Sequence, residues 1–391
     1  MLGQPATAGQ RQIRPTQFAV WTVLIIVRLH TDCEVAQPRR ADGSKVSHSI
    51  ERSETQTGRK RVRSAPLVLG GVWVIPGTCC NAAGGLGLAD NAVWTPLNIP
   101  GALDILSFGW SLAGGDFNGD TKDDLAIGGF GAVVILNGGS SGLNPANGSQ
   151  VWTLAGLTGS GSTSEFFGWA LAAGDFNGDG KSDLAIDIPL GAFGPTPANS
   201  GFVVVLYGSQ TLGLTAAGSQ FWNSASLGQT AVKNDSFGLA LAAGDFNGDG
   251  KSDLAIGIPL RDFNGLTDAG EVDVIYGSST GLSIASHVPT ILHDAVGAES
   301  GQQFGAALTA WNFGRDELFG TPPRQFVLKT ADLAVGVPLQ NVAGVSGAGA
   351  VNVFYGSFYS NGVTTANAQN LTAFSVFLDP LAGAHFGGAL Y

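Results

Sequence analysis

Short apolar runs alternate with clusters of Gly, Asn, Asp and Ser along most of the chain. GFVVVLYGS from Gly201 and DLAIGIP from Asp253 are typical of these runs. Segments of this length, rich in Val, Ile and Phe and bounded by turn residues, predict β-strands joined by hairpins. A sustained helical period is absent from the sequence. The pattern therefore predicts an all-β chain of many short strands.

Three of these runs recur in a fixed order with a unit of about 60–70 residues, which is the mark of a repeat architecture. The dipeptide Phe-Gly opens an apolar run at Phe108, Phe167, Phe237, Phe304 and Phe386. A second run of the type G-x-V-x-V-x-Y-G begins at Gly71, Gly131, Gly201, Gly270 and Gly349. A third, of the type DLAIGIP, begins at Asp124, Asp183, Asp253 and Asp332.

Each unit is expected to hold four strands: the G-x-V-x-V strand, a weaker strand such as SQFWNSAS, the Phe-Gly strand and the DLAIGIP strand. Four antiparallel strands repeated around an axis predict a β-propeller. Residues 67–391 hold four full units and three strands of a fifth. Pairing of residues 60–70 with 386–391 would close a five-bladed ring. An incomplete ring or a truncated product is the alternative.

Composition and charge limit the classes of function that we expect for this chain. Glycine accounts for 59 of the 391 residues, as expected for many tight turns, and only 13% of residues are charged. Residues 1–66 carry 11 Lys/Arg and 5 Asp/Glu, which leaves 8 basic and 25 acidic residues for the rest of the chain. Such an acidic body argues against a nucleic-acid partner and suits divalent cations.

The first 66 residues differ from the repeats. Arg11 and Arg14 precede the apolar run Phe18–Val27, the layout of a signal peptide within residues 1–36. This run is too short for an ordinary membrane span, which needs about 20 residues. Residues 37–66 have the composition of a disordered basic linker. We expect export to the cell envelope, the cell surface or the medium, with a mis-assigned start or a non-native leader as the alternative.

The most informative stretch is DFNGDGKSD, which follows the Phe-Gly strand. Its oxygen-bearing side chains fall at positions 1, 3, 5 and 9, and the backbone carbonyl at position 7 is a further candidate ligand. These oxygens match the ligands of Ca²⁺, which takes 6–8 of them. The three intact copies supply Asp116, Asn118, Asp120, Lys122 and Asp124; Asp175, Asn177, Asp179, Lys181 and Asp183; and Asp245, Asn247, Asp249, Lys251 and Asp253.

The copies are not equivalent. Gly180 and Gly250 at position 6 allow the positive φ that the bend demands, whereas Thr121 occupies this position in the first copy. The fourth copy has lost its pattern, because Asn312 replaces the first aspartate and Gly314 stands at position 3. We therefore expect about three Ca²⁺ sites. A metal-free Asp/Asn/Gly turn is the alternative for each.

The combination of Phe-Gly, DFNGDGKSDLAIGIP and G-x-V-x-V-x-Y-G resembles FG-GAP repeats. These build the N-terminal β-propeller of integrin α subunits and occur in many bacterial surface proteins. The resemblance covers residues 67–391 and implies Ca²⁺ held in hairpin loops on one face of the propeller. Integrin propellers have seven blades, so this chain falls short of them, and their partner-binding surfaces do not carry over.

Catalytic motifs give weaker signals. Gly138–Gly142 and Gly277–Gly281 match G-x-S-x-G, but both lie in the same inter-strand turn without the helix that a nucleophile elbow needs. Trp110 and Trp169 are expected to pack between blades rather than to form a sugar platform. The five histidines lack metal-ligand spacing.

We therefore expect a non-enzymatic, Ca²⁺-stabilised module that binds a protein or glycan at the cell surface, as in adhesion. A hydrolase or enzyme subunit that uses the propeller as a scaffold is the alternative. Its sign would be convergent polar groups in the central channel. A third hypothesis is that the chain is a fragment of a larger repeat protein.

Overall fold

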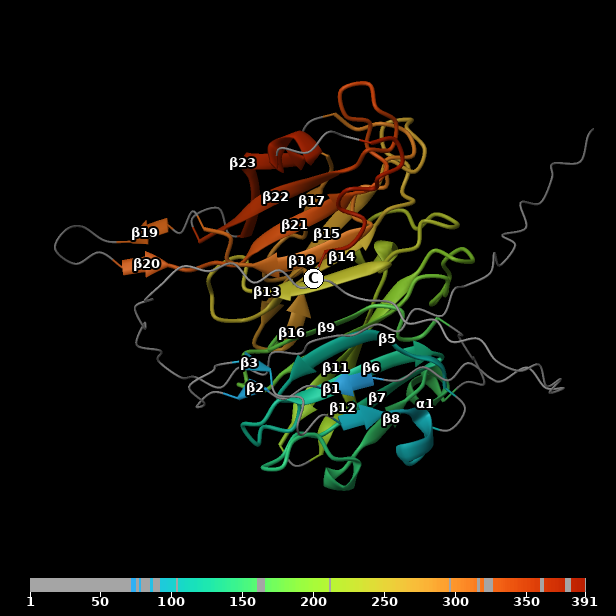
Figure 1. The fold of residues 1–391 in the computed structure, drawn as a ribbon, viewed down its shortest axis with the longest axis vertical. Helices are drawn as coiled ribbons and strands as arrows, with labels where there is room; N and C mark the ends of the chain where they lie inside the picture. The colour runs from blue at the N-terminus through green and yellow to red at the C-terminus, as the bar shows by residue number, and fades with distance from the viewer. Residues whose placement is uncertain are drawn as a thin grey trace, which may run out of the picture.

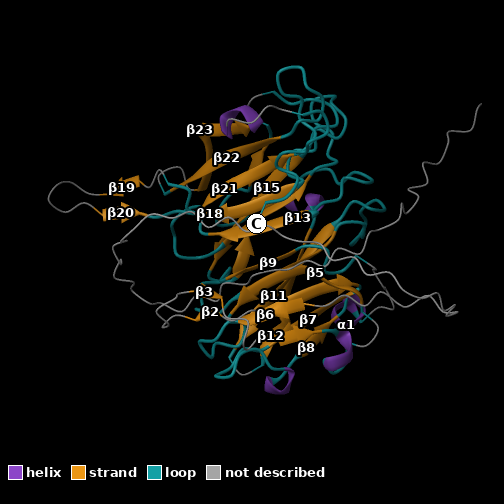
Figure 2. Ribbon diagram, viewed as in Figure 1, coloured by secondary structure: helices purple, strands orange, loops and turns teal. Residues whose placement is uncertain are grey.

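The computed structural model shows an all-β protein whose sheets form the blades of a β-propeller (Figures 1 and 2). Four antiparallel sheets of four or five strands follow one another along the chain. Among the described residues, helices are confined to short turns of three to five residues. The structure describes residues 72–74, 77–78, 85–86, 92–102, 105–159, 166–210, 212–294, 297–314, 317–319, 326–358, 362–376 and 381–390.

Each blade begins with the Phe-Gly strand and ends with the weaker fourth strand. Blade 1 holds β5 (Leu106–Gly115), β6 (Asp124–Phe130), β7 (Ala132–Leu136) and β8 (Gln150–Trp152). Blade 2 holds β9 (Leu171–Gly174), β10 (Asp183–Ile188), β11 (Phe202–Ser209) and β12 (Gly213–Trp222). Blade 3 holds β13 (Ala240–Gly244), β14 (Asp253–Ile258), β15 (Glu271–Ser278), β16 (Gly281–Ser283) and β17 (Thr290–Leu292). Blade 4 holds β18 (Ala307–Trp311), β21 (Asp332–Val337), β22 (Ala350–Ser357) and β23 (Gly362–Thr372).

The remaining elements are small. Three two-stranded pairs join β1 (Val72–Val74) to β4 (Ala92–Trp94), β2 (Gly77–Thr78) to β3 (Gly85–Leu86), and β19 (Glu317–Phe319) to β20 (Phe326–Leu328). The short helices are η1 (Pro96–Asn98), η2 (Pro145–Asn147), α1 (Leu154–Thr158), η3 (Ser224–Leu227) and η4 (Ala373–Val376).

The strands are those expected, but the sheets group them differently. The expected unit began at the G-x-V-x-V strand, whereas this strand is the third of each sheet. In blade 2 it pairs with the preceding DLAIDIP strand, with Leu184 opposite Leu206. The repeat is therefore shifted by half a unit against the blade, because the connection between these two strands lets them pair antiparallel within one sheet.

Neighbouring blades pack face to face through their apolar side chains. Val133 and Ile135 of β7 form one buried cluster with Phe202 and Val204 of β11. The innermost strands β5, β9, β13 and β18 contact one another in this order (Figure 1). The phenylalanine of each acid loop is fully buried in the cluster between its blade and the next, as Phe117 is between blades 1 and 2.

The Phe-Gly dipeptide ties each blade to the preceding one. Phe237 is fully buried, and its N–H donates to the carbonyl of Ser200 at 2.9 Å. Gly238 follows with φ +98°, and a Cβ there would lie 2.9 Å from Val203 Cγ2 and 3.2 Å from Asp187 Cβ. The repeat therefore needs glycine at this position, both for the left-handed backbone and for the close approach of the blades.

The same contact occurs at the end of blade 4. The N–H of Phe386 donates to the carbonyl of Ala348 at 3.0 Å, and Phe386 forms a parallel bridge with Gly349. This segment therefore docks on blade 4 as Phe237 docks on blade 2. The predicted pairing that would close a five-bladed ring involves residues 60–70, which lie outside the described residues.

The innermost strands of all four blades, together with residues 388–390, line an open axial cavity of about 770 Å³. Its walls are mainly alanine, leucine and glycine, and Trp110 and Trp169 also line it. The rings of these two tryptophans lie 4.7 Å apart, and Phe130 stacks on Trp169 at 6.1 Å. The expected packing of Trp110 and Trp169 between blades is confirmed, although 45% of Trp110 stays exposed.

A buried polar network replaces part of the apolar packing between blades 2 and 3. Arg261 Nη1 lies 2.8 Å from Asp235 Oδ2, and Arg261 Nη2 donates to Gln229 at 3.1 Å. Gln229 Nε2 in turn donates to Asp273 Oδ1 at 2.9 Å. Asp273 is fully buried, and its Oδ2 has no hydrogen-bond partner among the described residues. Burial, and then the nearby charge of Glu271, raise the pKa of Asp273 to about 8.

We expect Gly238→Ala to lower the free energy of unfolding by about 2 kcal/mol or more, because it combines left-handed strain with a clash between blades. Gly228→Ala is the matched control, since Gly228 has φ +79° and a Cβ added there would have no atom within 4 Å. It should cost only the strain of about 1 kcal/mol. Urea denaturation measures both. Equal losses in the two variants would contradict the inter-blade role of Gly238.

Asp273→Asn should flatten the pH dependence of stability. The folded carboxyl keeps its proton to about pH 8, while in the unfolded chain its pKa is near 3.8. This group therefore opposes folding increasingly as pH rises through that window. The variant should remove up to about 1.4 kcal/mol per pH unit of this decline. Denaturation curves across the window measure the slope, and parallel slopes in the two proteins would contradict the prediction.

Candidate metal centre

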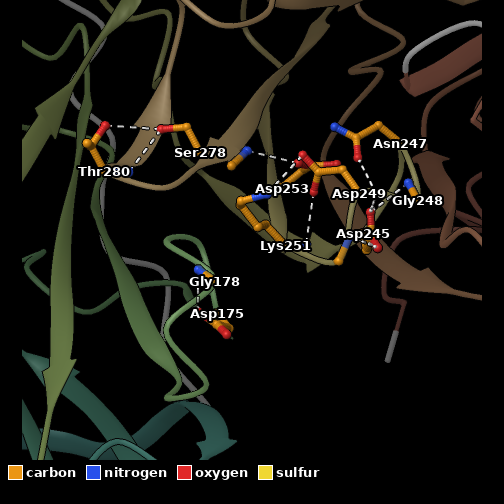
Figure 3. Close-up of polar contacts among 12 residues, drawn as sticks. Asp175, Gly178, Asp245, Asn247, Gly248, Asp249, Lys251, Asp253, Ser278 and Thr280 are labelled. Atoms are coloured by element: carbon orange, nitrogen blue, oxygen red, sulfur yellow. Dashed lines mark hydrogen bonds and ion pairs between the residues drawn. The ribbon is translucent and has the colours of Figure 1, made fainter.

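The three intact acid loops connect the two innermost strands of blades 1, 2 and 3. They join β5 to β6, β9 to β10 and β13 to β14, so each occupies the same end of its hairpin. The five predicted ligand positions of each copy therefore come together in one turn. Figure 3 shows the loop of blade 3, with Asp245, Asn247, Asp249 and Asp253 gathered around it.

The aspartate at position 1 shapes the turn. Asp245 Oδ1 accepts the N–H groups of Gly248 at 2.7 Å and Asp249 at 3.1 Å, and Asp245 Oδ2 accepts that of Gly250 at 2.9 Å (Figure 3). Asp175 makes the same three bonds in blade 2, at 2.7, 3.0 and 2.8 Å. The carboxylate at position 1 thus holds the backbone in the bend by hydrogen bonds alone.

The side chains at positions 3 and 5 bend back onto the turn in the same way. Asn247 Oδ1 accepts the N–H of Asp249 at 2.9 Å, and Asp249 Oδ1 accepts the N–H of Lys251 at 2.9 Å. Blade 1 repeats this pattern with Asn118 and Asp120. Each of these oxygens retains a second lone pair, so the hydrogen bonds do not prevent coordination of a cation.

The aspartate at position 9 lies deeper than the others. Asp124, Asp183 and Asp253 are fully buried, and burial raises their pKa values to about 6, 7 and 8. The charges at positions 1 and 5 raise the pKa of each of them further, as a smaller effect than burial. A cation in the loop would offset this repulsion.

The lysine side chain at position 7 pairs with the carboxylate at position 5. Lys181 Nζ lies 3.1 Å from Asp179 Oδ2, and Lys251 Nζ lies 3.4 Å from Asp249 Oδ2. These pairs are partly exposed and contribute little to stability. The sequence pattern assigned only the backbone carbonyl of these lysines a role, so the ion pairs were missed.

The donor set fits a hard divalent cation such as Ca²⁺: three carboxylates, one amide oxygen and one backbone carbonyl in each loop. Within the part of the chain that the structure describes, no three His, Cys, Asp or Glu side chains already form a metal-binding cluster. A cation in these loops therefore depends on the amide and backbone oxygens as well as the carboxylates. Asp116, Asp175 and Asp245 would supply the ligand at position 1 of the three loops.

The fourth copy differs as expected. Asn312 Oδ1 accepts the N–H of Gly314 at 3.0 Å, and the chain then enters the β19–β20 hairpin, which projects from blade 4 (Figure 1). An inserted hairpin thus stands where blades 1–3 have the acid turn. Asp332 keeps its place at the start of β21.

The catalytic alternatives gain no support from the site geometry. Gly277–Gly281 forms the tight turn between β15 and β16, and no helix follows it. His293 stacks on Phe263, with ring centroids 3.6 Å apart, and lies 3.7 Å from Glu271. It therefore packs within blade 3.

Comparison with known proteins identifies the class. Residues 108–136, 167–206 and 237–275 match the FG-GAP repeat, and these segments hold the three acid loops. Over 227 residues the chain is 30% identical to integrin alpha-PS2 of Drosophila melanogaster, covering 56% of this chain and 15% of the integrin. It is 30% identical to integrin alpha-8 of Mus musculus over 190 residues, which is 47% of this chain and 16% of that protein.

A different relative is phosphatidylinositol-glycan-specific phospholipase D of Mus musculus, 37% identical over 124 residues, or 32% of this chain and 14% of the enzyme. The chain thus matches 14–16% of the length of these relatives. The chain therefore contains three FG-GAP repeats, and it is similar to integrin α chains. In the described residues no helix is long and apolar enough to cross a membrane.

Thr121 provides a test of the turn geometry. It occupies position 6 of the first loop with φ +69°, a conformation that a β-branched residue adopts at a cost. Thr121→Gly should raise the free energy of unfolding by about 1 kcal/mol, while Gly180→Thr in the second loop should lower it by about the same amount. Chemical denaturation in EDTA measures both. Changes of equal sign would contradict the equivalence of the two turns.

Proposed function

We propose that the protein is an exported, Ca²⁺-binding propeller that acts without catalysis as a surface or extracellular binding module. The observation that carries this proposal is the set of three equivalent acid loops, each with the same oxygen donors at the same positions. Ca²⁺ would be structural: it neutralises the crowded carboxylates of Asp245, Asp249 and Asp253 and their counterparts, and it holds the hairpin ends in place.

The binding role is supported by the similarity to proteins named integrins, and the described lining of the cavity is mainly apolar. Ser111 and Thr309 carry the hydroxyl groups of its described lining, and neither histidine nor acid contributes to it. The acids with raised pKa values, such as Asp183 and Asp273, lie in the loops and between blades. We propose a cell-surface protein or glycan as the partner.

The second candidate is a propeller that serves as the scaffold of a hydrolase. It is favoured by the similarity to a protein named phospholipase D. The site geometry adds nothing to it, because the described residues that line the axial cavity do not include the convergent polar groups that such a site needs. Hydrolysis of a glycosylphosphatidylinositol substrate by the full chain would favour this candidate over the first.

Removal of Ca²⁺ tests the structural role. Ca²⁺ at a hundredfold excess over its Kd should add about 2.7 kcal/mol per site to the stability of the folded protein, so EDTA should lower its melting temperature by several degrees. Asp249→Ala should reduce the Ca²⁺-dependent shift by about a third, since one of three sites is lost. The control is Asn312→Ala in the fourth copy, which should leave the shift unchanged.

A melting temperature that is equal in Ca²⁺ and in EDTA would refute Ca²⁺ binding. The binding role is tested separately by a glycan array probed with the full chain in Ca²⁺ and in EDTA. Retention that requires Ca²⁺ would support a glycan partner, and the lack of any retention would favour a protein partner.

A further inference from the structure

Asp253 makes a contact that its role as a metal ligand does not explain. Its Oδ2 accepts the N–H of Phe246 at 2.9 Å and its Oδ1 accepts the N–H of Gly277 at 2.9 Å. The carboxylate thus clasps the start of the acid loop to the end of β15. The same clasp joins Asp124 to Phe117 and Gly138, Asp183 to Phe176 and Gly208, and Asp332 to Phe313 and Gly356.

The residues beside each clasp reach the loop of the preceding blade. Ser278 follows the clasped Gly277, and its N–H donates to the carbonyl of Phe176 at 3.2 Å. Ser209 donates to Phe117 at 3.2 Å and Ser357 to Phe246 at 3.0 Å in the same manner. The clasps and these bonds alternate, so that one chain of hydrogen bonds passes through all four blades.

Asp332 is the informative member of this chain, because its own loop has lost the cation pattern. It is buried, with 2% of its surface exposed, and accepts the N–H groups of Phe313 at 2.7 Å and Gly356 at 3.0 Å. The residue before it, Ala331, donates to the carbonyl of Asp245 at 2.7 Å. The residue after the clasped Gly356 is Ser357, which holds the carbonyl of Phe246.

Ala331, which precedes Asp332, and Ser357, which follows the clasped Gly356, therefore bind the carbonyls of the first two residues of the blade 3 loop. The Asp332 carboxylate thus holds the backbone next to the two N–H groups, of Ala331 and Ser357, that bind the carbonyls of Asp245 and Phe246. These carbonyls belong to the backbone from which the Asp245 side chain begins. This explains why the fourth copy keeps its aspartate at position 9 although position 1 has lost its aspartate and position 3 its asparagine.

We propose that Asp332 is a positioning residue for the acid loop of blade 3, acting across the interface from blade 4. The expected effect of Asp332 on Ca²⁺ affinity rests on the proposed function, whereas the positioning of the loop does not. It extends to blades 1 and 2, where Asp183 and Asp253 hold the loop of the preceding blade and also belong to loops of their own. Asp332 allows the positioning role to be tested apart from metal binding, because its own loop has lost the cation pattern.

The test compares Asp332→Asn with Asp294→Asn in the full chain. Asparagine keeps the size of the side chain but replaces one acceptor with a donor that faces an N–H. Asp294 is the matched control, because it accepts hydrogen bonds from Gln340 at 2.9 Å and Asn352 at 3.0 Å where blades 3 and 4 meet, outside the chain of clasps. Both variants are measured at a temperature where they are folded.

Two readouts are taken. Amide hydrogen exchange in EDTA should be about tenfold faster in residues 245–251 of Asp332→Asn than in the wild type, while residues 116–122 keep their rates. Calorimetric titration with Ca²⁺ should show one of the three sites weakened by about tenfold or more, the effect expected for a partner outside the ligand set. Asp294→Asn should change neither readout.

The outcomes separate the two proposals. If the wild type takes up no Ca²⁺, the proposed function fails and hydrogen exchange alone decides the role of Asp332. If exchange in residues 245–251 is the same in both variants, or if all three loops accelerate equally in Asp332→Asn, the positioning role is overturned. Faster exchange confined to the blade 3 loop supports it, with or without Ca²⁺.

Discussion

The close approach of neighbouring blades is the constraint on which this structure depends. Backbone meets backbone at the Phe-Gly dipeptide: the N–H of Phe237 donates to the carbonyl of Ser200 at 2.9 Å, and that of Phe304 to Ala269 at 3.0 Å. A side chain at Gly257 would overlap the carbonyl of Gly305. Glycine is therefore required on both sides of the contact, and the high glycine content follows from packing as much as from turns.

The acid loops depend on the same approach. Each loop sits at the end of an innermost hairpin, and its first two carbonyls accept N–H groups from the next blade, as Asp175 does from Ser252 at 2.8 Å. Loop geometry and blade assembly thus share one set of hydrogen bonds. A cation that orders a loop would also strengthen the contact with the neighbouring blade, which gives a structural ion an effect beyond its own hairpin.

Much of this arrangement could be predicted from residue patterns. The strands, the propeller and the placing of Asp175, Asn177 and Asp179 in one hairpin turn follow from local signals that recur in register. The grouping of strands into blades did not follow, because a repeat has no marked beginning and any phase of it fits the sequence equally well. The role of Asp332 was also missed, since its partners lie in other segments and its own loop looked merely degenerate.

The sequence by itself determined the strand positions, the repeat and the chemistry of the acid loops, because hydrophobic period, turn residues and donor spacing are local properties. Only the tertiary structure decided which acids lose their contact with water. Asp187 stands where blade 3 has Gly257, and it is fully buried against the N–H of Ala170. Asp273 lies where blade 2 has Val204. Burial raises the pKa of both carboxyls, because packed neighbouring blades remove the water that would stabilise their charge.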